Sequence, residues 1–355
     1  MAPLVVRRVH GSVFHNVVIV KSVMIKIVVD GAIPFLRERL EGKVELISLP
    51  SSEINADAVR EVDALIVRTR TKINASLLEG SKVRFVSTAT AGADHIDTDW
   101  CEANGVTVFT ASGCNAPGVA QYVLASLLRS DFNPETGVLG IVGKGNVGSI
   151  VVSWARQLGI WAVVSDPLRA RRGLKDENYL PLEDLLKKSD AVTFHVPLTF
   201  KNDFPTYRML NSENLSLLKR DAVVINASRG GVIEEKAVLA RLDGHGQLVV
   251  DTWENEPKIS LETLSEAFVA TPHIAGYSLE GKQRATNMVI EGLNKYFDLN
   301  IEAAGLAGHF ENKAGITRDK ILDSYNPLED TNLLKENPSA FEYIRNNYNY
   351  RREPS

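Results

Sequence analysis

A short apolar segment that runs into closely spaced glycines constrains the fold of this chain more than any other stretch. Residues 138–142 read as a buried strand, and the chain continues directly into the spacing Gly143-x-Gly145-x-x-Gly148. A helical pattern of apolar residues follows at 150–158. A strand, a glycine turn and a helix in this order predict the first βαβ unit of a dinucleotide-binding domain.

Each glycine has its own physical role in such a turn. Gly143 permits the tight turn, Gly145 lets the backbone approach a pyrophosphate, and Gly148 lets the helix pack close to the strand. The phosphates would then lie at the helix N-terminus, where unpaired N–H groups and the helix dipole favour negative charge. We therefore expect a dinucleotide at this turn.

The choice of dinucleotide depends on the end of the next strand, predicted at 160–165. Asp166 follows it, about 20 residues past the glycines, where a carboxylate can bind both ribose hydroxyls and repel a 2′-phosphate. The basic run at 169–172 would argue for NADP, but such a run in a surface turn is usually only solvated. We predict NAD as the cofactor.

Length and composition limit the class of protein. A chain of 355 residues predicts two domains plus an extra element. Its net charge of −4 gives no reason to expect a nucleic acid or an anionic membrane as partner, and no apolar run is long enough to span a bilayer. Cys101 and Cys114 are too few for a disulfide framework, which suits the cytoplasm.

Residues 1–23 form an N-terminal extension that we expect to be poorly ordered. They contain three basic residues and no acid, and they precede Met24, which opens a clean strand. Two explanations fit, a transit peptide or a start codon assigned too early. We favour the second, because the apolar runs are short and no small-residue cleavage site follows them.

The rest of the chain alternates strands and helices, which predicts parallel sheets with helices on both faces. The strands are expected at 25–29, 44–49, 64–68, 84–87 and 106–109, then at 138–142, 160–165, 191–194, 222–225, 247–250 and 267–270. Helices are expected at 35–40, 76–80 and 98–103, at 119–128 with Asn115 as its cap, and at 279–297.

These elements divide into two doubly wound domains. We predict a discontinuous substrate domain at 24–115 and 277–298, with an NAD-binding domain of six strands inserted at 116–276. The substrate domain would have a flavodoxin-like order, and the NAD domain would be a Rossmann fold. Residues 299–355 differ in character and form a separate C-terminal segment.

Reactive side chains follow three consecutive strands of the predicted NAD domain. Arg229, Glu256 and His273 come after the strands at 222–225, 247–250 and 267–270, at the edge where open α/β sheets bind ligands. An arginine suits a substrate carboxylate, a histidine can take the hydroxyl proton, and a carboxylate can orient the histidine. Each residue alone could be an ordinary surface or loop group; together they predict hydride transfer from a 2-hydroxy acid.

With these motifs the chain resembles the D-isomer-specific 2-hydroxyacid dehydrogenases over residues 24–298. The resemblance implies catalytic roles for Arg229, Glu256 and His273, with Glu256 rather than Glu254 as the glutamate. It implies an NAD site made by the glycine turn and further contacts. The full set of cofactor residues is Gly143, Gly145, Asn146, Val147, Gly148, Asp166, Val196, Ala227, Asp251 and Gly276.

Within that family the chain resembles the members that act on 4-phospho-D-erythronate. The segments at 67–74, 87–97 and 274–282 carry this likeness, as does the tail from Phe341. The resemblance implies a homodimer made through the C-terminal segment and a small phosphorylated 2-hydroxy acid as substrate. The substrate residues would be Thr69, Thr90 and Tyr277, and Arg68 and Arg70 after the third strand would hold the phosphate.

Some features depart from that pattern. Gln121 stands where a glutamate is usual, Val196 replaces a commoner threonine, and the tail is short. Arg351 and Arg352 suggest a further hypothesis, that the tail reaches the phosphate of a partner subunit. No cluster has metal-ligand spacing, so we expect no metal.

The sequence as a whole predicts a cytoplasmic, homodimeric NAD-dependent dehydrogenase that oxidises 4-phospho-D-erythronate to its 2-oxo acid, on the route to pyridoxal 5′-phosphate. Two alternatives stay open. One is another 2-hydroxyacid dehydrogenase, acting on phosphoglycerate or glyoxylate. The other is a protein that binds NAD as a sensor and has lost its chemistry, because a fold alone does not fix function.

Overall fold

The computed structural model describes residues 24–174, 177–303 and 315–354, so the expected N-terminal extension lies outside it. The described chain forms two compact units, one of residues 24–110 and 288–303, the other of residues 111–287 and 315–354. The boundaries expected after residues 115 and 276 therefore fall after 110 and 287. Helix α11 (Leu279–Phe297) accounts for the second shift, because it starts in one unit and ends in the other.

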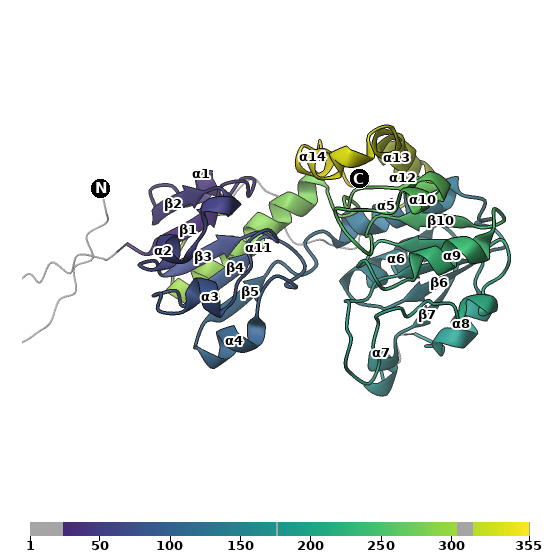
Figure 1. The fold of residues 1–355 in the computed structure, drawn as a ribbon, viewed down its shortest axis with the longest axis horizontal. Helices are drawn as coiled ribbons and strands as arrows, with labels where there is room; N and C mark the ends of the chain where they lie inside the picture. The colour runs from purple at the N-terminus through teal and green to yellow at the C-terminus, as the bar shows by residue number, and fades with distance from the viewer. Residues whose placement is uncertain (1–23, 175–176, 304–314, 355) are drawn as a thin grey trace, which may run out of the picture. The chain divides into compact units, whose positions relative to one another are not determined.

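The first unit is a parallel α/β layer structure (Figure 1). Its strands pair in the order β2-β1-β3-β4-β5, all parallel, which is the 2-1-3-4-5 order of flavodoxin-like sheets. The elements are β1 (Lys26–Asp30), α1 (Arg37–Leu40), β2 (Glu45–Leu49), α2 (Ala56–Val59), β3 (Ala64–Val67), α3 (Ala75–Leu78), β4 (Phe85–Thr88), α4 (Thr98–Ala103) and β5 (Thr107–Thr110), with a 3-10 turn at Ser51–Glu53.

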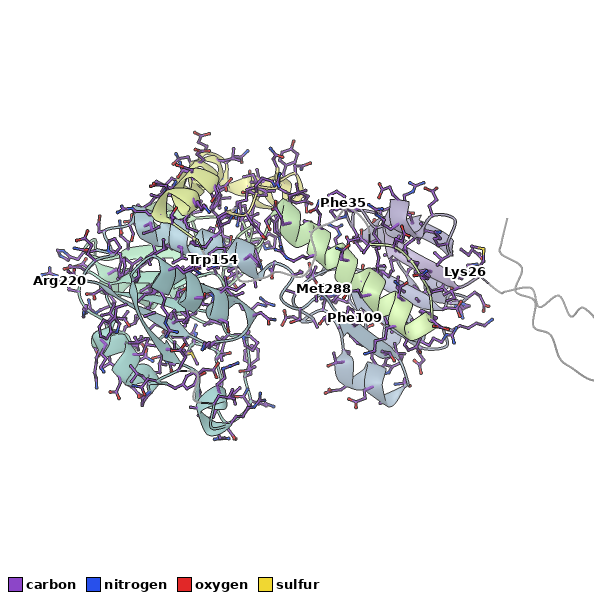
Figure 2. All side chains as sticks on the ribbon, turned by 180° about the vertical axis from the view of Figure 1, so that it is seen from behind. Lys26, Phe35, Phe109, Trp154, Arg220 and Met288 are labelled. Atoms are coloured by element: carbon purple, nitrogen blue, oxygen red, sulfur yellow. The ribbon has the colours of Figure 1, made fainter. Side chains whose placement is uncertain are left out.

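Alternating side chains in these strands explain the two helix layers. Ile27 and Val29 of β1 pack in a cluster with α1 and the last turns of α11, whereas Val28 packs in the cluster of α2, α3 and α4. Figure 2 shows Phe109 of β5 beside α11, where Gly292 leaves room for the ring. The unit thus buries both faces of its sheet.

The second unit carries a six-stranded parallel sheet in the order β11-β10-β9-β8-β6-β7. Its strands are β6 (Val138–Val142), β7 (Trp161–Ser165), β8 (Ala191–Phe194), β9 (Val223–Asn226), β10 (Gln247–Val250) and β11 (Val269–Ala270). The helices packed around it are α5 (Ala116–Arg129), α6 (Asn146–Gln157), α7 (Pro167–Arg171), α8 (Leu182–Lys188), α9 (Glu235–Leu242) and α10 (Leu261–Glu266), with a 3-10 turn at Leu215–Leu217.

One short contact completes the expected topology. Tyr179 forms an isolated parallel bridge with Val164 on the outer side of β7. We count Tyr179 as a third strand and number the strands from β6 onward in chain order. The sheet then has the order 3-2-1-4-5-6 of Rossmann folds, with β11 added beside strand 6. The predicted fold class of two doubly wound parallel-sheet domains is confirmed.

The C-terminal tail belongs to the second unit rather than standing apart from it. It consists of α12 (Arg318–Ser324), α13 (Pro327–Glu336) and α14 (Phe341–Asn346), with a 3-10 turn at Pro338–Ala340. Leu334, Phe341 and Ile344 are buried in the same cluster as β8, β9 and β10, and Ile321 of α12 joins the cluster of α5 and α6. The tail therefore completes the core of this unit.

Helix α5 begins after Asn115, as the sequence predicts, but the Asn115 side chain does not cap the helix. Asn115 is its N-cap residue and Pro117 lies in its first turn, yet the Asn115 side chain makes no capping hydrogen bond. That side chain lies instead against Gly276, where any Cβ would collide with it. Asn115 thus packs the start of α5 against the loop after β11.

Candidate active site

The predicted cofactor and catalytic residues of the second unit all follow the carboxyl ends of its strands. Because the strands are parallel, these ends share one edge of the sheet. The strand order reverses at β6, whose neighbours are β7 and β8, which is where such sheets bind ligands. The residues in question are Gly143 after β6, Asp166 after β7, Val196 after β8, Ala227 and Arg229 after β9, Asp251 after β10, and His273 after β11.

The glycine turn is built as a dinucleotide site requires. Gly143 has φ 88°, and a Cβ there would lie 2.6 Å from the carbonyl oxygen of His195, so the turn packs on the end of β8. A Cβ on Gly148 would collide with the carbonyl oxygen of Gly143. A Cβ on Gly145, by contrast, would meet no heavy atom of the described chain within 4 Å. Protein packing therefore accounts for Gly143 and Gly148, whereas a Cβ at Gly145 would point into open space, and its predicted role in the approach of a pyrophosphate stays a prediction.

Helix α6 starts directly at this turn. Gly145 is its N-cap and supplies no side-chain acceptor, so the first-turn N–H groups of Asn146 and Val147 have no side-chain cap. An N-terminus of this kind favours an anion through its N–H groups and dipole. The amide of Asn146 donates to Ser112 Oγ at 3.1 Å, which leaves its main chain as the part suited to phosphate.

Asp166 has a structural role in addition to the predicted one. Its Oδ2 accepts from the N–H of Lys144 at 2.9 Å and its Oδ1 caps α7 by accepting from the N–H of Arg169 at 3.0 Å. Each carboxylate oxygen can accept a second bond, so both can still receive ribose hydroxyls. The carboxylate is thereby held at the end of β7.

The basic run beside Asp166 is engaged with the protein. Nε of Arg169 donates to Tyr179 Oη at 3.0 Å, and Arg171 forms an ion pair with Asp203 at 2.5 Å. These contacts give two of the arginines partners other than a 2′-phosphate.

A buried ion pair under the glycine turn was missed by sequence reasoning. Nζ of Lys144, which sits between the first two glycines, lies 2.8 Å from Glu177, and Arg156 of α6 lies 2.6 Å from the same carboxylate. Burial opposes ionisation of Glu177, but its hydrogen bonds to Arg156 and Lys144 hold its pKa below the usual value. A lysine within the glycine motif was the available signal, but its partner is 33 residues away.

Glu256 and His273 form a hydrogen-bonded pair. Nδ1 of His273 lies 2.8 Å from Oε2 and 3.0 Å from Oε1 of Glu256, while Oε1 also accepts from the N–H of Trp253 at 2.9 Å. An ionised carboxylate at Nδ1 selects the tautomer that carries its proton there, which leaves the Nε2 lone pair as a base. This geometry suits proton transfer at Nε2.

The backbone of His273 is also unusual. Its φ is 57°, in the left-handed region that costs a residue with a Cβ about 1 kcal/mol or more. The N–H of His273 donates to the carbonyls of Asp251 and Thr271 at 2.9 and 3.0 Å, which holds this conformation. Strain of this kind concentrates at active sites, where it fixes the direction of a side chain.

Asp251 faces the protein interior. Its carboxylate is 1% exposed and accepts from Thr271 Oγ1 at 2.7 Å, from the N–H of Ile274 at 2.7 Å and from the N–H of Ala275 at 3.0 Å. Burial raises its pKa above the usual value, although these bonds and the nearby His273 oppose that rise. Asp251 thus fixes the loop on both sides of His273.

The loop of Arg229 packs against the loop that leads to Glu256. Asn226 Nδ2 donates to the carbonyls of Arg229 at 3.0 Å and Thr252 at 3.3 Å. Gly230 lies so close to the carbonyl oxygen of Trp253 that any Cβ would collide with it. Arg229 is half-buried, and its Nη1 donates to the carbonyl of Ser228 at 2.8 Å. The arginine loop, the glutamate and the histidine therefore lie on adjoining loops of one edge.

The remaining residues of this unit are placed as follows. Val196 and Ala227 follow β8 and β9, and Val196 is close enough to Gly143 to exclude a Cβ there. Tyr277 Oη accepts from Nε of Arg345 at 3.3 Å, and Nζ of Lys282 lies 3.7 Å from the centre of its ring. Arg345 belongs to the C-terminal tail and was not predicted as part of the site.

The first unit holds the other predicted substrate residues at the carboxyl ends of two adjacent strands. Thr69 and Arg70 are exposed in the turn after β3, and Thr90 follows β4 with its Oγ1 2.7 Å from that of Thr88. Arg68 differs from expectation, because its Nε and Nη2 bind Asp30 at 2.9 and 3.2 Å. Two of the three guanidinium nitrogens of Arg68 therefore bind the carboxylate of Asp30.

Two further observations concern the described residues as a whole. Within residues 24–174, 177–303 and 315–354, no group of three or more histidines, cysteines, aspartates or glutamates could hold a metal ion. None of the helices in these ranges is both long and apolar enough to cross a membrane.

Comparisons with known proteins agree with this geometry. The sequence model of the NAD-binding domain of D-isomer-specific 2-hydroxyacid dehydrogenases matches residues 129–275. An erythronate-4-phosphate dehydrogenase of Bacteroides fragilis is 40% identical over 92% of this chain and 97% of its own length, and one of Proteus mirabilis is 43% identical over 75% and 72%. A 3-phosphoglycerate dehydrogenase of Entamoeba histolytica, solved with NAD, shares the fold at a TM-score of 0.66, with 24% identity over 81% of this chain and 100% of that one.

Proposed function

We propose a specific substrate for this chain, which belongs to the D-isomer-specific 2-hydroxyacid dehydrogenases and is an NAD-dependent oxidoreductase of CH–OH groups. The substrate is 4-phospho-D-erythronate, oxidised to 2-oxo-3-hydroxy-4-phosphobutanoate, a step of pyridoxal 5′-phosphate synthesis. The observation that carries this proposal is the 40% identity to an erythronate-4-phosphate dehydrogenase over 92% of this chain and 97% of that enzyme.

The chemistry follows from the side chains at the edge of the second sheet. Arg229 binds the substrate carboxylate through its planar guanidinium and polarises the neighbouring C2 oxygen. His273 accepts the C2 hydroxyl proton at Nε2, because Glu256 accepts a hydrogen bond from Nδ1. NAD, when bound at the glycine turn, supplies the acceptor for the hydride. Glu256 also stabilises the positive charge that His273 gains.

The phosphate end of the substrate gives the reaction its specificity. We assign it to Thr69, Arg70 and Thr90 at the strand ends of the first unit, with Arg68 as a weaker contact because it is paired with Asp30. Tyr277, which accepts a hydrogen bond from Arg345, stays a proposed substrate contact. Exposed and half-buried donors of this kind suit a dianionic phosphate.

Asp166 supports NAD as the preferred dinucleotide. Its carboxylate is fixed at the end of β7 by two main-chain N–H groups, at the place where the ribose of a bound dinucleotide lies in Rossmann folds. A 2′-phosphate there would meet a negative charge, so NADP should bind less well.

A panel of hydroxy acids tests the substrate directly. NADH fluorescence is followed with 4-phospho-D-erythronate, D-erythronate, 3-phospho-D-glycerate and D-lactate, and in the reverse direction with glyoxylate. We expect the highest kcat/KM with 4-phospho-D-erythronate and at least about a 100-fold loss for D-erythronate, which lacks the charged phosphate. A higher kcat/KM with 3-phospho-D-glycerate or glyoxylate would contradict the assignment.

We also infer a cytoplasmic homodimer made through the C-terminal segment. Leu333 and Tyr343, on α13 and α14, expose 48% and 70% of their surface, and both described cysteines are buried free thiols, which suits a reducing compartment. Light scattering of the wild type and of a Leu333→Glu, Tyr343→Glu double variant tests the dimer. A monomeric wild type would contradict it.

A further inference from the structure

The C-terminal helix delivers a cation to the carboxylate that pairs with the catalytic histidine. Nη1 of Arg345 lies 3.9 Å from Oε2 of Glu256, and its Nε donates to Tyr277 Oη at 3.3 Å. The Arg345 side chain is only 17% exposed, so this charge acts at close range with little screening by water. A residue of the tail is therefore part of the surroundings of the proposed base.

The geometry separates Arg345 from the reacting atoms. Glu256 binds the Nδ1 side of His273, whereas the substrate proton is taken at Nε2 on the opposite side of the ring. Arg345 contacts the carboxylate rather than the ring, so it can act on the reaction only through Glu256 and Tyr277.

We propose that Arg345 is a positioning residue that keeps Glu256 ionised and aimed at Nδ1 of His273. The inference rests on the proposed roles of Glu256 and His273. If Glu256 were protonated, it would donate to Nδ1, the imidazole proton would move to Nε2, and the ring could no longer accept the substrate proton. The tail thereby takes part in catalysis from inside its own subunit.

The other charges around Glu256 show why a cation is needed there. Glu235 and Glu254 lie on neighbouring elements, and the main-chain N–H of Glu254 donates to Glu235 at 2.7 Å. The groups that contact the carboxylate of Glu256 itself are His273, the N–H of Trp253 and Arg345. Burial favours the neutral form of Glu256, and the bonds from His273 and Trp253 together with the charge of Arg345 bring its pKa below the usual value.

The position of Arg345 is fixed by its helix. Phe341 and Ile344 of α14 are 1% and 8% exposed and pack in the core of the second unit. Glu342, one turn earlier, lies 3.8 Å from Nη1 of Arg345 on the same helix. A packed helix holds a side chain within the small tolerance that positioning requires.

The test compares two replacements of Arg345 with a matched control. Arg345→Gln removes the charge, Arg345→Lys keeps it, and Lys335→Met removes a different cation that ties α13 to the carbonyls of Ser265 and Ala267 at 3.0 and 2.9 Å. All are measured as full-length enzyme with saturating NAD, for kcat, KM and the pH profile of kcat/KM. Circular dichroism and NAD titration verify that each variant is folded.

We expect Arg345→Gln to lower kcat by about 10-fold with the Kd for NAD unchanged in the NAD titration. The acid limb of its kcat/KM profile should move to higher pH by about half a unit, because without the cation Glu256 takes up a proton at a higher pH, and the ring is a base only while Glu256 is ionised. Arg345→Lys should keep the limb in place, and so should Lys335→Met even if it unfolds at lower temperature. If Arg345→Gln does not fold, Arg345→Lys carries the test: an acid limb at higher pH or a kcat about 10-fold lower in this variant, which keeps the charge, decides against the proposal.

Two results overturn the inference. One is an Arg345→Gln variant with the wild-type kcat and profile; the other is an equal shift in Lys335→Met, which would mean that the tail acts only through stability. The assay uses whichever 2-hydroxy acid the wild type oxidises best. Failure of the wild type on 4-phospho-D-erythronate therefore counts against the proposed substrate and leaves the test of Arg345 intact.

Discussion

Nε of Arg351 donates a 2.9 Å hydrogen bond to Oε1 of Gln121, although 230 residues separate them in the chain. The other guanidinium nitrogens donate to main-chain carbonyls, Nη1 to Ile274 and Tyr277 at 3.0 and 3.2 Å and Nη2 to Gly118 and Ala275. All five N–H groups thus have acceptors in the same subunit. This arrangement overturns the hypothesis that Arg351 reaches the phosphate of a partner subunit.

Replacing Arg351 should destabilise the whole second unit. In Arg351→Met, buried carbonyls on α5 and on the loop of His273 lose their donor, and each unsatisfied group costs roughly 1–3 kcal/mol. We expect the free energy of unfolding in urea to fall by about 3 kcal/mol or more. Arg352→Met is the control, because Arg352 is 73% exposed and its ion pair with Glu280 should contribute less than about 1 kcal/mol. Equal losses in both variants would be inconsistent with this account.

The assigned base gives a second prediction. His273→Asn should lower kcat by about 10²- to 10⁴-fold at neutral pH, because the variant cannot accept the hydroxyl proton. The Kd for NAD should stay within about twofold, since the glycine turn is untouched. Stopped-flow and fluorescence titration measure the two quantities. Turnover close to that of the wild type would rule out His273 as the base.

The glycine turn allows packing and ligand approach to be separated. Gly145→Ala adds a methyl group that meets no heavy atom of the described chain, so stability should change by less than about 1 kcal/mol while the Kd for NAD rises about 10-fold or more. Gly148→Ala should instead destabilise the fold, because its Cβ would collide with the carbonyl of Gly143. Thermal unfolding and NAD titration of both variants check this contrast. Unchanged NAD affinity in Gly145→Ala would refute it.

Glu235 predicts how stability depends on pH. Burial raises its pKa from 4.5 to about 7, with Glu254 and Glu256 adding to the rise and the N–H of Glu254 opposing it. The folded state therefore holds a proton that the unfolded state has released. The stabilising effect of this proton is complete below pH 4.5 and is lost as the pH rises through about 7. The loss lowers the free energy of unfolding by about 3 kcal/mol.

Glu235→Gln should remove this dependence. The amide oxygen of Gln can still accept the bond from Glu254, and the side chain no longer ionises. We expect the variant to gain stability over the wild type at pH 8 and to match it near pH 4.5, in urea unfolding followed by fluorescence. A wild type that loses stability in parallel with the variant over this range would show that other groups govern the dependence.

Much of the fold followed from local sequence patterns. The predicted strands at 138–142, 191–194 and 247–250 and the helices at 98–103 and 279–297 have the bounds of the observed elements. Short apolar runs and helical periodicity indicate which faces of an element are buried. Both patterns are set by residues that are close together in the sequence. The short helices α7 to α10 and the single-residue bridge of Tyr179 were missed, because they carry little periodicity of their own.

The sequence by itself determined the glycine turn, the acid after β7 and the placement of Arg229, Glu256 and His273 at successive strand ends. Chain order and the rule that parallel strands end at one edge suffice for that. Only the tertiary structure decided which partners these residues meet. Arg345 beside Glu256, Arg351 on the loop of His273 and Arg68 on Asp30 are pairings between distant segments. No local periodicity encodes them, since they arise when separately formed elements pack together.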